Sequence, residues 1–161
     1  MSFRKKLYTV VWLGGVVASL DILAAVTHAY IARGTSPVIV LQYIASGALG
    51  GIAFEGGMMT AVVGLLFHYF IATFWTAAYL IAYPRVAILR RIRLGSGIGY
   101  GLFVWLMMNL VVVPMSRIPA RPLVLQNVAI GALILIAMVG LPIAFIVSRT
   151  YEQQARTSPR D

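Results

Sequence analysis

Long apolar segments alternate with short polar connections along the chain. Four of these segments reach about the 20 residues that a transmembrane α-helix needs at a rise of about 1.5 Å per residue. They cover residues 7–31, 57–83, 97–115 and 124–148. The pattern therefore predicts an all-α membrane protein, with four transmembrane helices in a single domain over residues 1–161.

A fifth apolar stretch, 37–54, is shorter and interrupted by glycines. Ser36 is a favoured N-cap residue and Pro37 suits the first helical position, so we expect a helix to begin here. The glycine-rich sequence GALGG should end it, which predicts a half-helix over about 37–47. This half-helix is expected to lie at the outer interface, or to dip into the membrane and return. A full span is the alternative.

The start of the chain also fits a secretory signal peptide, because a basic RKK sequence precedes an apolar stretch and VVA at 16–18 suits a cleavage site. However, the apolar character resumes after Asp21 and continues to Ile31. That length is enough for a full span, so an uncleaved first helix is favoured.

The basic residues are distributed unequally between the two ends of the predicted bundle. One end carries ten of the 13 Lys and Arg residues: Arg4, Lys5, Lys6, Arg85, Arg90, Arg91, Arg93, Arg149, Arg156 and Arg160. The other end carries Arg33, Arg117 and Arg121. Because cytoplasmic loops are enriched in Lys and Arg, both termini are expected to be cytoplasmic.

Composition and charge placement narrow the function classes. The hydrophobic fraction is 61% and the charged fraction is 11%, whereas soluble domains average about 45–50% and about 25%. The net charge of +9 is concentrated in short clusters between apolar runs, an arrangement that favours anionic lipid headgroups over nucleic acid. The absence of cysteine excludes disulfides and thiolate metal sites.

Three predicted spans each carry one polar residue at nearly the same depth. Asp21, His68 and Asn109 lie about 20–22 Å from the inner ends of their helices, whereas the fourth span offers only Ile134 there. A neutral His68 could donate to Asp21 and accept from Asn109. Polar groups at such depth are costly, so a proton-handling or ligand-contacting site is one interpretation. The other, which we favour slightly, is a network that only holds the helices together.

A second polar group is predicted further outward. His28 lies seven residues after Asp21, on the same face of the helix. Glu55 directly precedes the helix at 57–83 and could accept hydrogen bonds from its unpaired backbone N–H groups. We expect Glu55 to cap that helix and to pair with Arg33 or His28.

No metal or cofactor is predicted. Haem ligation by two histidines needs both rings at one level, but His28 lies about two helical turns further out than His68. Zinc needs three or four clustered ligands, more than either polar group supplies.

Closely spaced glycines begin the third span at Gly95, Gly97, Gly99 and Gly101. Small residues four apart allow helix backbones to approach closely. The contact could be internal or could form a homo-oligomer. In the last span, Pro142 is expected to kink the helix near its inner end.

Helix 57–83 carries Gly64, His68 and Ala72 at four-residue spacing, followed by Tyr79 and Pro84. With the glycine-rich start of the third span and the sequence VVVP at 111–114, this layout resembles the YagU-like bacterial inner-membrane proteins over residues 60–115. The resemblance implies an inner-membrane location and assigns no chemistry. This chain departs from it in the last span, where such proteins carry a histidine.

Three functions are consistent with the sequence. The favoured one is proton-linked or small-solute transport through Asp21, His68 and Asn109, with the glycine-interrupted half-helix shaping an outer entrance. The alternative is a non-catalytic membrane module that binds a partner protein or a lipid. The least favoured is an enzyme acting on a lipid or quinone with His68 as base.

Overall fold

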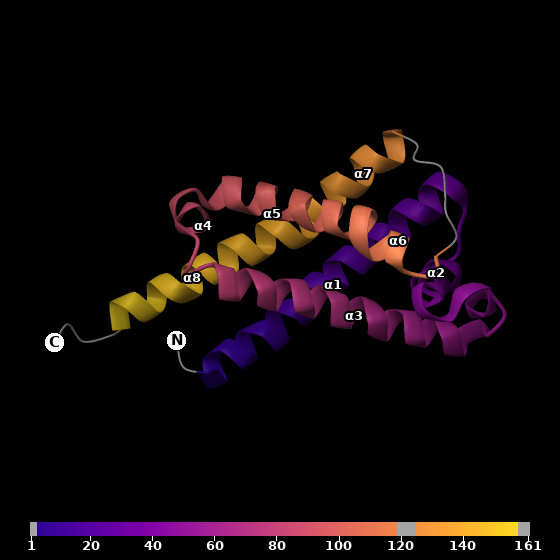
Figure 1. Cartoon of the computed structure of the whole chain (residues 1–161), viewed down its shortest axis with the longest axis horizontal. Helices are drawn as coiled ribbons and strands as arrows, with labels where there is room; N and C mark the ends of the chain where they lie inside the picture. The colour runs from indigo at the N-terminus through magenta and orange to yellow at the C-terminus, as the bar shows by residue number, and fades with distance from the viewer. Residues whose placement is uncertain (1–2, 119–124, 158–161) are drawn as a thin grey trace.

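The structure of the protein, a computed structural model, describes residues 3–118 and 125–157, and over these residues it contains helices and no strand (Figure 1). Five helical segments are long and apolar enough to cross a membrane, judged by length and composition: Phe3–Arg33, Pro37–Phe54, Gly57–Ala82, Arg93–Met115 and Leu125–Arg156. The all-α, membrane-type class agrees with the sequence prediction. The count differs by one, because the stretch that begins at Pro37 is also long enough.

The helices follow one another with short connections. Their bounds are α1 (Phe3–Arg33), α2 (Pro37–Leu49), η1 (Gly50–Phe54), α3 (Gly57–Ala82), α4 (Ala87–Arg91), α5 (Arg93–Met107), η2 (Met108–Val112), α6 (Val113–Met115), α7 (Leu125–Leu135), η3 (Ile136–Gly140) and α8 (Leu141–Thr157). α5, η2 and α6 form one continuous helical segment, as do α7, η3 and α8.

α2 begins where the sequence predicts it. The Ser36 hydroxyl oxygen accepts a hydrogen bond from the Ile39 backbone N–H at 3.4 Å, and Pro37 is the first helical residue. The helix continues past the predicted end near residue 47 and stops before Gly50, whose φ of 68° lies in the left-handed region. Gly57, at the start of α3, also has a positive φ, of 55°. These two glycines lie on either side of η1.

The direction of α2 differs from that of the long helices. α1, α3, α5 and α8 run along the length of the molecule, whereas α2 is viewed nearly along its own axis (Figure 1). α2 therefore crosses the bundle at the end where α1 finishes and α3 begins. α6 and the start of α7 lie at this same end, and α4, the start of α1 and the end of α8 lie at the opposite one.

A buried hydrophobic core lies toward the end of the bundle where α1 begins and α8 ends. Its buried cluster comprises Leu13, Val17, Tyr79, Leu80, Tyr83, Val139, Ile143, Ala144 and Val147. The side chains come from α1, α3, η3 and α8, so four helical segments close around one core. This core fills the bundle interior on that side.

Glycines bring α5 into backbone contact with η3. A Cβ atom added to Gly140 would collide with the backbones of Gly97 and Gly101. Gly97 and Gly101 therefore serve an internal contact and are not available for a homo-oligomer. Gly95 lies beside Ile92 of the same chain, whereas Gly99 has open space where a side chain would be.

Two π-helical turns interrupt the long segments, each ending two residues before a proline. η2 ends before Pro114 and η3 ends before Pro142. Proline lacks a backbone N–H and its ring crowds the carbonyl four residues earlier, so the preceding turn widens. The distortion expected at Pro142 thus takes the form of a π turn.

Candidate ligand-binding cavity

α1 and α3 approach each other closely beside the candidate polar residues. A Cβ atom on Gly14 would lie 2.7 Å from the Thr73 hydroxyl oxygen, so only glycine fits there. Further along the same interface, the Ser19 and Tyr69 hydroxyl groups share a hydrogen bond of 2.7 Å. These contacts fix the register of the two helices around His68.

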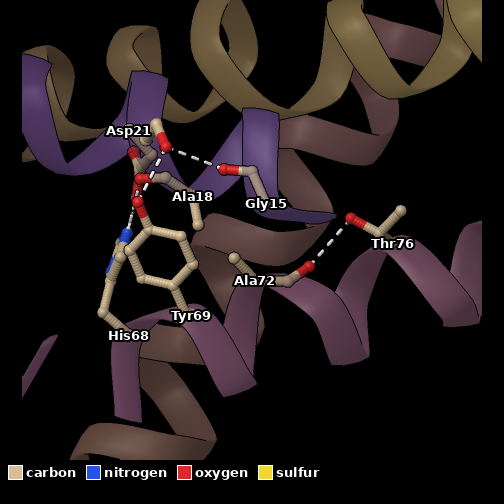
Figure 2. Close-up of polar contacts among 8 residues, drawn as sticks. Gly15, Ala18, Asp21, His68, Tyr69, Ala72 and Thr76 are labelled. Atoms are coloured by element: carbon tan, nitrogen blue, oxygen red, sulfur yellow. Dashed lines mark hydrogen bonds and ion pairs between the residues drawn. The ribbon is translucent and has the colours of Figure 1, made fainter. Parts of the chain in front are cut away.

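Asp21 and His68 come together across this interface (Figure 2). His68 Nε2 lies 2.9 Å from the Ala18 carbonyl oxygen and 3.8 Å from Asp21 Oδ2. Because a carbonyl oxygen can only accept, Nε2 carries the hydrogen and donates it to Ala18. Asp21 therefore lies beside the imidazole without receiving its hydrogen bond.

The Asp21 carboxylate lacks a strong donor. Its side chain is 16% exposed and that of His68 is 13% exposed. Within residues 3–118 and 125–157, no hydrogen bond reaches the carboxylate oxygens, and the nearest cation-forming group is the imidazole at 3.8 Å. A carboxylate in this situation retains capacity for a further partner.

Asn109 does not join this pair. Its side-chain amide donates to the Trp105 carbonyl oxygen at 2.9 Å, one turn earlier on its own helix. The predicted hydrogen bond from Asn109 to His68 is therefore wrong. Asn109 lies in the π turn η2 and still lines the same cavity as His68.

The cavity has a volume of about 1230 Å³ and is enclosed by residues of α1, α2, α3, α5, η2, α6, α7 and η3. It extends from Trp75 and Val139, beside the packed core, to Arg33 and Thr35 at the end of the bundle crossed by α2. Ligand pockets usually measure about 300–1,000 Å³, so this volume is enough for a drug-sized molecule.

Polar groups line the cavity at several levels and most of its remaining surface is apolar. α1 contributes Asp21, His28 and Arg33, and α3 contributes His68. α7 contributes Asn127 at the exposed rim, which the sequence analysis missed because it considered only the level of Ile134. Tyr43, Trp75 and Trp105 add aromatic surface.

Trp75 is held rigidly in the cavity wall. The residue is 9% exposed, and its ring meets Phe74 and Phe103 edge-on at centroid distances of 5.2 and 5.9 Å. Its indole N–H is buried without a hydrogen-bond partner among the described residues. A buried donor without an acceptor is uncommon in native proteins and directs attention to this part of the wall.

Glu55 does not have the predicted role. Gly56 is the N-cap of α3 and no side chain caps this helix start. Glu55 is exposed, and the ion pairs of the described residues join other groups, so the predicted pairing with Arg33 or His28 is also wrong. Its position in the turn after η1 leaves its carboxylate at the surface.

Gln42 and Thr60 stabilise this turn instead. The Gln42 amide donates to the Gly57 carbonyl oxygen at 2.9 Å, and the Thr60 hydroxyl donates to the Ala53 carbonyl oxygen at 2.6 Å. Gln42 is buried. An isolated glutamine in an apolar half-helix was the sequence signal for this role.

Within the residues that the structure describes, no three His, Cys, Asp or Glu side chains gather as a metal site would require. No protein-family model, curated protein or solved structure matches this chain. The fold and the cavity therefore define the class: an all-helical, membrane-type protein with a ligand-sized cavity inside its bundle.

Proposed function

We propose that this protein moves a small solute across a membrane and uses the cavity as its binding site. The observation that carries the proposal is the cavity of about 1230 Å³, which reaches one end of the bundle and places Asp21 and His68 on its inner wall. Intramembrane ionisable residues that line a cavity are typical of substrate and proton pathways.

The packed core supports a carrier rather than an open pore. Leu13, Val17, Tyr79 and Ile143 are fully buried in the core cluster, which adjoins the cavity at Val139. A solute that enters the cavity would meet this barrier. Passage then requires the helices to rearrange, as they do in alternating access.

α7 is the wall best suited to move. It has no buried residue along Leu125–Leu135, whereas α1 and α3 each have several. α7 is joined to α8 through the π turn η3, which contains Gly140 and precedes Pro142. η3 itself stays packed against α5, so a movement of α7 would pivot where α7 enters this π turn.

The charge distribution supports an orientation in which the cavity opens outward and both termini are cytoplasmic. The basic clusters would then contact anionic headgroups. In this arrangement four helices span the membrane and α2 lies across their outer end. The resemblance to YagU-like proteins favours the bacterial inner membrane.

Single-cysteine labelling tests the proposal directly, because the chain contains no cysteine of its own. Ala25→Cys places a thiol in the cavity, and Leu23→Cys is its matched control. Leu23 is 64% exposed and lies two residues earlier, on a different face of α1. A membrane-impermeant maleimide should label only the Ala25→Cys variant, and only from the outside of vesicles at rest.

Transport predicts that a transported solute increases labelling of the Ala25→Cys variant from the inside. Equal labelling from both sides at rest would indicate an open pore. Labelling from the outside that no solute changes would contradict transport and favour a static binding module.

A lipid-binding module is the second candidate, favoured by the apolar walls of the cavity. Native mass spectrometry of the gently solubilised protein, with an optical spectrum of the same sample, separates the two candidates. A retained lipid that also prevents labelling of the Ala25→Cys variant supports the module.

A further inference from the structure

We propose that the cavity binds an organic monocation with an apolar body, and that the positive charge of the ligand lies against the Asp21 carboxylate. This inference rests on the proposed function, because it concerns the same cavity. It adds the chemical class of the solute.

Asp21 is the acidic residue that lines the cavity. The described part of the chain contains three acidic residues, of which Asp21 lines the cavity and Glu55 and Glu152 do not. Glu152 is paired with Arg93. Asp21 therefore determines which charge the inner cavity prefers.

The surroundings of Asp21 leave its charge unsatisfied. His68 directs its Nε2 hydrogen to the Ala18 carbonyl oxygen at 2.9 Å rather than to Oδ2 at 3.8 Å. Because that hydrogen is used by Ala18, the imidazole does not hydrogen-bond to the carboxylate. A carboxylate without a hydrogen-bond donor on the cavity wall favours a cationic or hydrogen-donating ligand.

The other ionisable groups of the cavity lie further outward. His28 and Arg33 are seven and twelve residues beyond Asp21 on α1, which places them about 10 and 18 Å away along the helix axis. Neither can form a hydrogen bond to Asp21 at that separation. The positive charge of Arg33 therefore belongs to the mouth of the cavity.

The rest of the wall suits the body of such a ligand. Trp75, Trp105 and Tyr43 come from three different helices and line the cavity together with aliphatic side chains. Aromatic faces attract cations, most strongly when water is excluded. Trp75 is already fixed by its contacts with Phe74 and Phe103, so little ordering is needed when a ligand binds.

An anionic ligand would use different groups. A phosphate or carboxylate would have to remain near Arg33 at the exposed rim, and Asp21 would repel it from the inner cavity. The two ligand classes therefore predict different critical residues.

Tetraphenylphosphonium and tetraphenylborate form a suitable pair of probes, because they have nearly the same size and shape and opposite charge. Binding to the full chain in dodecylmaltoside can be measured by isothermal titration calorimetry. We expect saturable binding of the phosphonium at one site per chain and no saturable binding of the borate. Asp21→Asn should weaken phosphonium binding about tenfold, the change expected from loss of one screened charge–charge attraction.

Three control variants keep the test decisive. Asp21→Glu retains the charge and should retain phosphonium binding, which separates the effect of charge from a folding defect. Glu55→Gln removes an exposed acid outside the cavity and should have no effect. Arg33→Gln should leave phosphonium binding unchanged or slightly stronger.

Two results would overturn the inference. One is saturable borate binding that Arg33→Gln abolishes, and the other is phosphonium binding that is absent or insensitive to Asp21→Asn. In either case, one-sided, solute-sensitive labelling of the Ala25→Cys variant would show that the transport proposal stands and only the ligand class is wrong. Failure of that labelling would count against transport, whichever probe binds.

Discussion

The hydroxyl groups of Ser19 and Tyr69 lie 2.7 Å apart, and the adjacent residue, His68, donates to the Ala18 carbonyl oxygen at 2.9 Å. Two neighbouring residues of α1 are thus joined to two neighbouring residues of α3 (Figure 2). The inner wall of the cavity depends on this pair of contacts.

Ser19→Ala and Tyr69→Phe should each destabilise the protein modestly. Hydrogen bonds between membrane helices contribute about 0.6 kcal/mol on average, because the separated helices also find partners. Unfolding in mixed micelles should give a coupling free energy of that order in a double-mutant cycle. Full additivity of the two substitutions would show that the hydroxyl contact contributes nothing.

The His68 imidazole should carry a hydrogen on Nε2. The Ala18 carbonyl requires a donor at that nitrogen. The chain contains two histidines, so ¹⁵N spectra of protein labelled in histidine can be assigned by comparison with a His28→Gln variant. An Nε2 nitrogen without a hydrogen would contradict the contact with Ala18.

Gly140→Ala should destabilise the fold strongly, because the added methyl group meets the backbones of Gly97 and Gly101. Overpacking of this kind costs about 1–3 kcal/mol, and collision with backbone belongs at the upper end. Gly99→Ala is the matched control on α5, since nothing lies within 4 Å of its added Cβ. That variant should gain about 0.5–1 kcal/mol from the helix preference of alanine. Thermal unfolding in detergent measures both effects.

Pro114→Ala should rotate Asn109 away from the cavity. Without the proline, η2 can become an ordinary α-helix, which has one residue fewer in this turn. The residues of the turn then rotate about the helix axis by about 100°. Maleimide labelling of Asn109→Cys should then fall. The neighbouring residue Leu110 is 65% exposed. Leu110→Cys is therefore the comparison, both with Pro114 present and with Pro114→Ala. Unchanged labelling would mean that the π turn does not depend on the proline.

Gln42→Leu should destabilise the connection from α2 to α3. The substitution removes the amide that donates to the Gly57 carbonyl oxygen in a buried position, at a cost of about 1–3 kcal/mol. Glu55→Gln, in the same turn but exposed, should remain within about 0.5 kcal/mol of the parent protein. Equal effects of the two substitutions on the unfolding temperature would contradict these roles.

Helix positions and the approach of Asp21 to His68 could be predicted because both depend on distance along a helix axis. Length and apolarity locate the segments, and a rise of about 1.5 Å per residue gives each polar group its depth. Asp21 and His68 are at matching depth on helices that are in contact, and their side chains lie 3.8 Å apart.

The direction in which a side chain points around its helix axis could not be predicted in the same way. Asn109 has the depth of His68, but the π turn changes the helical phase and the amide finds its acceptor at Trp105. α3 begins at Gly57, as predicted, but Gly56 rather than Glu55 is its N-cap. Gly57 supplies a left-handed turn there that a helix count does not reveal.

Glycines mark close helix contacts in both halves of the described chain. In the first half, Gly14 meets Thr73 between α1 and α3, and Gly64 meets the Leu41 backbone between α3 and α2. In the second half, Gly140 meets Gly97 and Gly101 between η3 and α5. During membrane insertion, each pair can associate as soon as its own two helices are in the bilayer. The cavity lies between these halves, so its walls are completed only when the two halves dock. Biogenesis would thus complete the rigid helix pairs first and the ligand-binding space last.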